Sequence, residues 1–387
     1  MTRNPIKDIV AIVGVGTTGF TRSSDHSSLA LALDASTRAI RDAGLAAADI
    51  NGVVSVAEPG APGPETLATA LGLANVTHFS KPTPVVMNSI VDAMNALFAG
   101  SCDTVLVCSS MLRLPWNSRS AANDPFRGHL LGGAAGIPES INMAPAYTAW
   151  ASRYLHEYGV GKEPFGRIAV NMRTNAAANP LAAMRATITL DDYYAARMIR
   201  EPLCLLDMDI PVDGADALVL TTADRAARLP HPPVLIHAAT VGLGTSDEDQ
   251  LPSLARHGQH VVIDALRAKS DLWLDDIDVY LPYDGFTIIT LGWIENTGWC
   301  PPGQAARFLA DNWDRDAGRI MIDGRIPVNP HGGSLSEGAT RGTGHLREAV
   351  VQLRGEAGDR QVPGAKTALV TPGGFFFNAQ GAILRAP

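Results

Sequence analysis

Short buried-strand patterns alternate with amphipathic helix patterns in two stretches of this chain, which a proline-rich joint, Leu229–Pro233, separates. Such alternation predicts an α/β protein, and 387 residues are too many for one ordinary hydrophobic core. We therefore expect two α/β halves, residues 1–228 and 234–387. The expected strands are Ile9–Val15, Ile50–Val56, Thr77–Ser80, Thr104–Ser109, Ala215–Thr221, Val234–Thr240, Ile277–Leu281, Thr367–Val370 and Ala382–Arg385. The expected helices are 28–44, Asn88–Ala99, His257–Lys269, Phe286–Asn296 and Gly344–Leu353.

Residues from about 110 to 212 interrupt this alternation. They are rich in loops and carry three further helix patterns, Pro145–Tyr158, Glu163–Ala178 and Leu190–Arg200. We interpret them as a loop domain inserted in the first half. The two halves suggest an internal duplication, but the identity between them is too weak to establish one from the sequence.

Composition excludes several classes of function. A net charge of −8 argues against nucleic acid as the main partner. No segment approaches the roughly 20 apolar residues of a membrane span, and the N-terminus MTRNPIKDIVAIVGVG has no signal-peptide pattern. The four cysteines (Cys102, Cys108, Cys204 and Cys300) have irregular spacings and form no CxxC pair, so neither disulfides nor a metal site is expected. We expect a cytoplasmic protein that contacts no membrane.

A Gly-x-Gly-x-x-Gly motif, Gly14 to Gly19, follows the first strand and precedes a helix. In dinucleotide-binding proteins an acidic residue ends the next strand about 20 positions later. Here Asp34 falls inside the helix pattern instead. The motif therefore favours a tight strand–helix turn over a dinucleotide site.

The most specific motif is a glycine-rich loop near the C-terminus, with the sequence NPHGGSLSEGATRG from Asn329 to Gly342. Other segments accompany it: NMRTNA from Asn171, PLCLLD from Pro202, DGADA from Asp213, YDGF from Tyr283, GHLREAVVQLRG from Gly344 and the pair Gly373-Gly374. In order and spacing these segments resemble the thiolase superfamily, in particular its sterol-carrier-protein-type and lipid-transfer-protein branch, over nearly the whole chain. The resemblance implies the thiolase fold, with two similar α/β halves in layers αβαβα, and a homodimer whose site accepts a CoA thioester.

The reactive positions of that family are replaced in this chain. Rough alignment puts Thr83 or a neighbour where a thiolase has its nucleophilic cysteine. Tyr283 and Gly285 stand in place of the histidine and cysteine of a His-Asp-Cys-Phe element, Ala339 in place of the histidine of a Gly-His-Pro element, and Thr371 in place of the last cysteine. A threonine cannot hold an acyl group as a thiolate does, and the four cysteines present are expected to be buried structural thiols. Acyl transfer through a cysteine is therefore disfavoured.

Some members of this branch lack the cysteine and are retro-aldolases. Their reaction needs a base for the β-hydroxyl proton and dipoles that stabilise the enolate forming at the thioester oxygen. By position Tyr283 fits the base, provided that its pKa of about 10 is lowered. The resemblance implies further candidates: His331 and His345 as a second acid/base, Gly332, Gly333, Ser334, Ser336, Gly373 and Gly374 as the oxyanion and CoA loop, and Arg341 for a CoA phosphate.

Each of these residues also has a simpler interpretation. Tyr283 can be a core tyrosine with a satisfied hydroxyl, either histidine can be structural, and Arg341 can be solvated. Asp284 is expected to bond the loop backbone. A Schiff base finds little support, with Lys81 as its one candidate, and no cluster of metal ligands is visible.

The sequence thus predicts a carbon–carbon lyase that acts on a β-hydroxyacyl-CoA, with a steroid side chain or another ring-bearing acyl group and no cofactor beyond the coenzyme A of the substrate. The alternatives are an acyltransferase and a silent acyl-CoA- or lipid-binding subunit. The resemblance also implies an OB-fold partner with a zinc ribbon, in a heterotetramer. Aromatic residues of the loop domain suggest a bulky acyl group; they are Trp116, Phe126, Tyr147, Trp150 and Tyr154.

Overall fold

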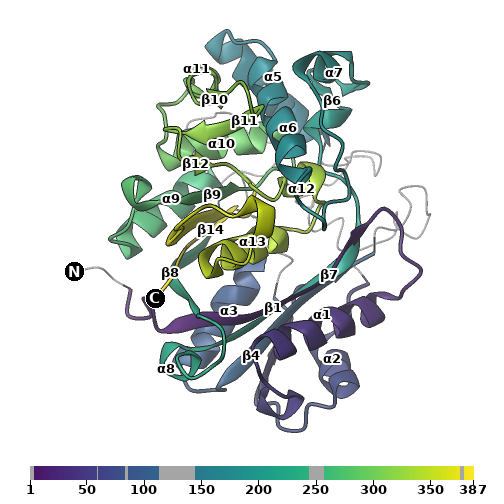
Figure 1. Cartoon of the computed structure of the whole chain (residues 1–387), viewed down its shortest axis with the longest axis vertical. Coiled ribbons are helices and arrows are strands. Elements are labelled where there is room, and N and C mark those ends of the chain that lie inside the picture. The colour runs from purple at the N-terminus through teal and green to yellow at the C-terminus, as the bar shows by residue number, and fades with distance from the viewer. Residues whose placement is uncertain (1–3, 59, 83–85, 113–143, 244–256, 375–378) are drawn as a thin grey trace.

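A computed structural model describes residues 4–58, 60–82, 86–112, 144–243, 257–374 and 379–387. Its centre is a nine-stranded sheet in the order β3-β2-β4-β7-β1-β8-β14-β13-β9 (Figure 1). The first half of the chain supplies β1 (Val10–Thr21), α1 (Ser28–Asp42), β2 (Gly52–Ser55), α2 (Pro64–Leu71), β3 (His78–Ser80), α3 (Val86–Phe98), β4 (Thr104–Met111) and β7 (Asp213–Thr222). The second half supplies β8 (Val234–Gly242), α9 (Gly258–Lys269), β9 (Val279–Pro282), α10 (Thr287–Thr297), α13 (Thr343–Arg354), β13 (Thr367–Thr371) and β14 (Ala379–Arg385).

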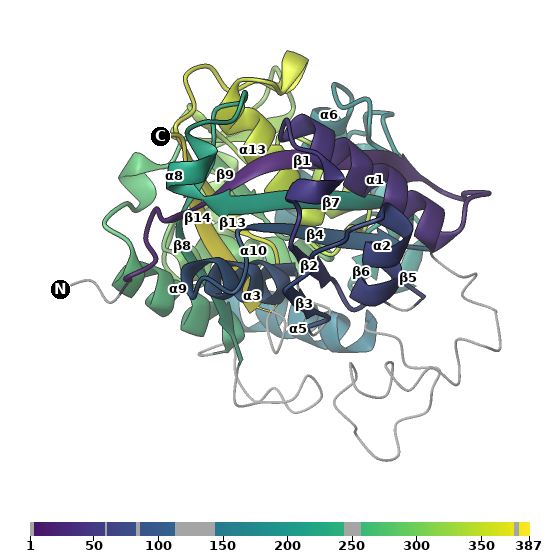
Figure 2. The ribbon, with the colours of Figure 1, turned by 90° about the horizontal axis from the view of Figure 1, so that it is seen from below.

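The two halves of the sheet repeat one another in mirrored order. β1 pairs antiparallel with β7 as β8 does with β14, and β7 pairs antiparallel with β4 as β14 does with β13. β4 and β2 are parallel, and so are β13 and β9. The halves meet where β1 pairs with β8, at Ala11 opposite Leu235 (Figure 2). The fold is therefore duplicated, as the sequence predicted, whereas the exact boundaries at 228 and 234 stay predictions.

Helices cover both faces of each half-sheet. Apolar side chains of α3 and α13 share one core with strands of both halves, so these two helices form the central layer. Helices α1 and α2 pack on the outer face of the first half-sheet, and α9 and α10 pack on that of the second. The layers are thus αβαβα, as predicted. Within the described ranges no helix has the length and apolar character that a membrane crossing requires.

The inserted region lies above the second half-sheet (Figure 1). Its described part contains α5 (Ala144–Tyr158), α6 (Glu163–Ala176), α7 (Leu190–Ala195), β5 (Met198–Arg200) and β6 (Leu203–Cys204). The prediction of one helix over Leu190–Arg200 was wrong, because Ala196 leaves the helical conformation and the chain then pairs as β5 with β6. Short elements complete the chain: α8 (Ala223–Ala226), α11 (Ala305–Asp311), β10 (Trp313–Asp314), β11 (Arg319–Ile322), β12 (Ile326–Pro327) and α12 (Gly333–Ser336).

The Gly-x-Gly-x-x-Gly motif lies inside β1 and is not a turn, so that prediction was wrong. A Cβ on Gly14 would lie 2.2 Å from the carbonyl oxygen of Ala39. One on Gly16 would lie 2.2 Å from the carbonyl oxygen of Ala35. Both glycines therefore allow α1 to pack directly on the backbone of β1. The helix begins at residue 28, as predicted, and its cap is Ser27.

We predict that Gly16→Ala destabilises the protein, because the new methyl group meets backbone atoms that cannot rotate away. Overpacking of this kind costs about 1–3 kcal/mol, measurable as a loss in the free energy of unfolding in urea. The matched control is Gly161→Ala, where a Cβ meets nothing within 4 Å; we expect a change within about 0.5 kcal/mol. Equal effects of the two substitutions would contradict the packing argument.

Candidate active site

One cavity of about 720 Å³ opens between the inserted region and the turn after β9. This volume falls in the range of small-molecule sites, roughly 300–1,000 Å³. Most of its wall comes from the insertion: Tyr147, Ala169, Arg173, Met184, Ile188, Arg197, Ile199, Leu205, Leu206, Met208, Asp209, Ile210 and Pro211. The rest is Arg22, Tyr283, Gly285, Phe286, Ile289, Leu335 and Arg341. The wall is mainly apolar, so the few polar groups decide how a ligand is oriented.

Tyr283 lies on this cavity, directly after β9, and its side chain is 7% exposed. Its backbone N–H donates to the carbonyl oxygen of Thr371, at 2.9 Å. A Cβ on Gly285 would lie 2.6 Å from the Tyr283 ring and 2.9 Å from its hydroxyl oxygen. The glycine at the cysteine position therefore makes room for the tyrosine at the histidine position, so the two replacements depend on each other.

Asp284 forms hydrogen bonds to the backbone of the glycine-rich loop. Its carboxylate accepts the backbone N–H groups of Ser334 (2.7 Å) and Leu335 (3.0 Å). Gly333 has a left-handed φ of 58°, and a Cβ there would lie 2.0 Å from an Asp284 oxygen. Only glycine permits this approach. The prediction that Asp284 bonds the loop backbone is confirmed.

His331 and His345 are fully buried behind the cavity and do not line it. His345 Nε2 lies 3.0 Å from an Asp284 carboxylate oxygen, and the two imidazole rings are 4.8 Å apart. His345 lies within α13. Burial, with smaller contributions from His345 and nearby arginines, holds the pKa of His331 well below its usual value. Because neither histidine lines the cavity, each could take part in the predicted acid/base chemistry only through Tyr283. The ring centroid of Tyr283 lies 5.8 Å from that of His345.

The predicted oxyanion groups are engaged elsewhere or lie outside the cavity wall. The Gly332 N–H donates to the carbonyl oxygen of Asn329, at 2.9 Å. The Gly373 carbonyl accepts from the indole N–H of Trp293, and Gly374 directly precedes residues outside the described part. The hydroxyls of Ser334 and Ser336 are buried without a partner among the described residues. Their role stays a prediction.

Arg341 lines the cavity and pairs with Glu58, with 3.1 Å between Nε and the carboxylate. The Glu58 carboxylate raises the pKa of Arg341, and Tyr283 and Asp209 contribute in the same direction against the effect of burial. The guanidinium is thus within electrostatic range of Tyr283. Its predicted contact with a CoA phosphate stays a prediction.

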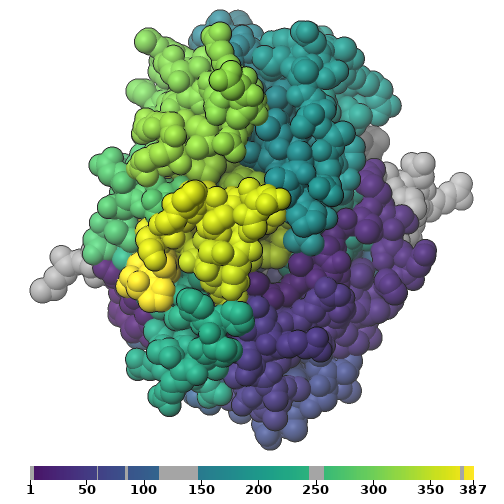
Figure 3. All heavy atoms as spheres, in the orientation of Figure 1, coloured from purple at the N-terminus to yellow at the C-terminus, as the bar shows by residue number. Residues whose placement is uncertain are grey.

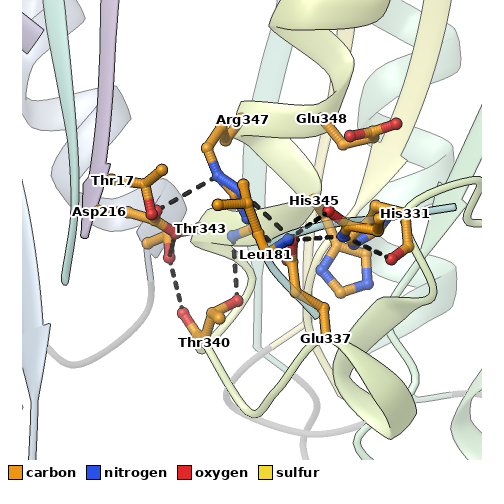
Figure 4. Close-up of polar contacts among 12 residues, drawn as sticks. Thr17, Leu181, Asp216, His331, Glu337, Thr340, Thr343, His345, Arg347 and Glu348 are labelled. Carbon is orange, nitrogen blue, oxygen red and sulfur yellow. Dashed lines mark hydrogen bonds and ion pairs between the residues drawn. The ribbon is translucent and has the colours of Figure 1, made fainter. Parts of the chain in front are cut away.

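A buried ion network fixes the loop to the rest of the fold (Figure 4). Arg347 on α13 lies 2.7 Å from Glu337 of the loop and 3.3 Å from Asp216 of β7. Asn179 of the insertion donates to Glu337 and to the carbonyl oxygen of His331, at 2.9 and 2.8 Å. Arg347 was not among the residues predicted for the site, although its place in the GHLREAV segment was a signal.

The cysteines are buried, as predicted, and Cys108 lies within β4. Burial raises the pKa of the thiols of Cys102 and Cys204 to about 11, and of Cys108 and Cys300 to about 12. None is a thiolate at neutral pH. The position expected for a nucleophile, Thr83, lies outside the described residues.

Other chemistries find no support in the described part of the chain. Lys81 is exposed, and its Nζ donates to the carbonyl oxygen of Ala61, at 3.2 Å. Within the described ranges no group of His, Cys, Asp or Glu residues is arranged to hold a metal ion.

Comparison with known proteins decides the family. Residues 252–386 match the family model described as thiolase C-terminal domain-like. A steroid side-chain-cleaving aldolase of Thermomonospora curvata is 34% identical, over 97% of this chain and 97% of its own length. The chain belongs to the thiolase superfamily. Within it, the 17-hydroxy-3-oxo-4-pregnene-20-carboxyl-CoA lyase of Mycobacterium tuberculosis is 33% identical, over 94% of this chain and 96% of its own length.

Solved structures agree with this assignment. The structure of the Ltp2-ChsH2(DUF35) aldolase superposes with a TM-score of 0.85 at 32% identity, over 98% of both chains. An acetyl-CoA acetyltransferase of Syntrophomonas wolfei, 16% identical with a TM-score of 0.68 over 98% of this chain and 100% of its own, shares the fold. This thiolase-superfamily chain is thus a carbon–carbon lyase of the aldolase type.

We predict that His331 lowers the stability of the protein as the pH falls into the acid range. The folded-state pKa of His331 lies below the unfolded value of about 6.5. The contribution of the neutral imidazole to the free energy of unfolding is therefore complete above that pH and is lost as the pH falls. The loss is at most about 1.4 kcal/mol per pH unit. In urea unfolding between pH 7.5 and 5, His331→Gln should show a flatter slope than the wild type, whereas His26→Gln, at an exposed position, should keep it. Parallel curves for wild type and His331→Gln would sink the prediction.

Proposed function

We propose that this lyase cleaves a β-hydroxyacyl-CoA by a retro-aldol reaction with Tyr283 as the base. The observation that carries the proposal is a phenol on the wall of a large apolar cavity, at a position where the thiolase pattern has a histidine. The phenolate takes the β-hydroxyl proton, the bond between Cα and Cβ breaks, and a ketone or aldehyde leaves. The electron pair passes to the thioester as an enolate, which is then protonated at Cα to give a shorter acyl-CoA.

Aromatic and apolar side chains on the cavity wall favour a ring-bearing acyl group. The Tyr147 and Phe286 rings stack there at 4.4 Å between centroids, beside the Ile188 and Met208 side chains. Trp150 and Tyr154 pack into the core elsewhere, and Trp116 and Phe126 lie outside the described residues. The names of two relatives, which refer to a steroid side chain and a pregnene carboxyl-CoA, support the same class of substrate.

A partner protein is part of the proposal. The similar solved structure is named Ltp2-ChsH2(DUF35) aldolase, with two components in its name. That name supports a complex of this chain with a DUF35-type partner. The OB fold and zinc ribbon of that partner, the homodimer and the heterotetramer are expectations that come from the family resemblance. The cytoplasmic location is an expectation of the same kind.

The two alternative functions have less support. An acyltransferase needs a reactive thiol, and burial raises the pKa of every cysteine of the chain. A silent binding subunit has no need for a tyrosine on the cavity wall within electrostatic range of Arg341.

We predict that the chain, co-expressed with a DUF35-type partner, releases a carbonyl compound and a shorter acyl-CoA from a ring-bearing β-hydroxyacyl-CoA. Because no acyl-enzyme forms, cleavage should need no free CoA and should survive treatment with iodoacetamide. Mass spectrometry of both products is the measurement. Product that appears only with free CoA would restore the acyltransferase, and no product from any of several acyl groups would favour the silent subunit.

We also predict that Tyr283→Phe lowers kcat by about 10²–10⁴-fold, the usual contribution of a general base. The Kd of a substrate analogue without the β-hydroxyl should stay the same, because the ring remains in place. Tyr194→Phe is the matched control, on an exposed tyrosine outside the cavity wall. Full turnover by Tyr283→Phe would assign the base to another residue.

A further inference from the structure

Arg173 is a buried cation without a partner among the described residues. It lies on α6, its side chain lines the cavity, and the residue is only 8% exposed. In the part of the chain that the structure describes, no carboxylate and no hydrogen-bond acceptor pairs with its guanidinium. Ala169, one helical turn earlier, lines the same wall, so this face of α6 is turned toward the ligand space.

The other cavity arginines are satisfied or solvated. Arg341 pairs with Glu58, Arg22 is exposed and donates to the carbonyl oxygen of Pro211 at 3.1 Å, and Arg197 is exposed. For Arg173, burial lowers the pKa, and no opposite charge among the described residues offsets it. Buried charges are ordinarily paired, and perturbed ones gather at functional sites. An oxygen with negative charge on the ligand would supply the missing partner.

Arg173 lies in the part of α6 that packs on the glycine-rich loop. The last turn of α6 packs on the glycine-rich loop, where a Cβ on Gly332 would lie 2.6 Å from the Ala176 Cβ and 3.0 Å from the Met172 carbonyl oxygen. The Arg173 side chain itself lines the cavity. Leu335 of the loop and Tyr283 lie on the same wall.

The retro-aldol reaction needs a group that stabilises the enolate, and three backbone N–H groups of the glycine-rich loop already have partners. Gly332 N–H donates to Asn329, and the N–H groups of Ser334 and Leu335 donate to Asp284. Neither glycine pair of the predicted oxyanion site lies on the described cavity wall. A fixed guanidinium in a largely apolar site is a strong alternative, because two N–H groups can donate to one developing oxyanion.

The geometry points to Arg173 as a catalytic residue that binds the thioester oxygen while it becomes an enolate. This inference rests on the proposed lyase function. When the bond between Cα and Cβ breaks, its electron pair forms the enolate double bond and the thioester C=O electrons move onto oxygen. Arg173 stays protonated throughout and donates hydrogen bonds to that oxygen, and the β-hydroxyl proton goes to Tyr283.

The test compares Arg173→Met with wild type and with Arg167→Met, each in complex with the partner. Arg167 lies on the same helix, pairs with Glu163 and does not line the cavity. Three quantities are measured: kcat for cleavage, exchange of the α-hydrogens of propanoyl-CoA in D₂O, and the Kd of cyclohexylpropanoyl-CoA, which has no β-hydroxyl. Arg173→Met should lose about 10²–10³-fold in cleavage and in exchange with a Kd within about threefold. Arg167→Met should resemble the wild type, and Arg173→Lys should recover part of both rates.

Several outcomes separate this inference from the proposed function. Exchange without cleavage by the wild type would reject the retro-aldol reaction, while the loss of exchange in Arg173→Met would still support the enolate role. A weaker Kd with unchanged kcat would show instead that Arg173 recognises a fixed carboxylate of the acyl group, and would overturn the inference. So would full activity of Arg173→Met, or a wild type that neither cleaves nor exchanges. If Arg173→Met does not fold, Arg173→Gln takes its place.

Discussion

The geometry of the site depends on the network of ion pairs around Arg347. Its guanidinium joins Asp216 of the first half, Glu337 of the loop and, through Asn179, the inserted region. All these side chains are buried, so loss of one partner would leave an uncompensated charge, at a cost of about 3–5 kcal/mol. In Figure 3 the yellow C-terminal part of the chain lies between the purple N-terminal part and the green part of the second half. One residue of α13 thus holds together three parts of the chain that all border the cavity.

The reactive positions depart from the thiolase pattern, whereas the fold is the one that thiolases share. Asp284 binds the glycine-rich loop, and the mirrored half-sheets surround α3 and α13. Side chains at the reactive positions of the thiolase pattern are replaced, and two of the replacements depend on each other, because the ring of Tyr283 occupies the space that a side chain at Gly285 would need. A carbon–carbon lyase and an acyltransferase can therefore share one fold, since the loop geometry depends on residues that do not react.

The sequence predicted the fold more fully than the site. Strand and helix patterns are local and repeat with fixed periods, so most elements and both halves could be found. The Gly14–Gly19 motif was misread because its glycines serve the packing of α1, which is a contact between segments and not a local conformation. Tyr283 and Arg341 could be located from the family motifs. Arg173 could not, because a missing partner in the cavity has no signature in the sequence, and its helix pattern shows only that it lies beside Met172.

The residues that would recognise the acyl group and those that would carry out the reaction come from different parts of the chain. Its apolar wall comes mainly from the insertion, whereas Tyr283, Leu335 and Arg341 come from the second half. Because the network of Arg347 fixes the loop independently of Ile188, Ile199 or Leu205, those wall residues can change without moving the reacting groups. Arg173 is the exception, since it reaches the cavity from the insertion but packs next to the loop through Ala176. The position of α6 therefore couples the shape of the acyl pocket to the charge that the reaction needs.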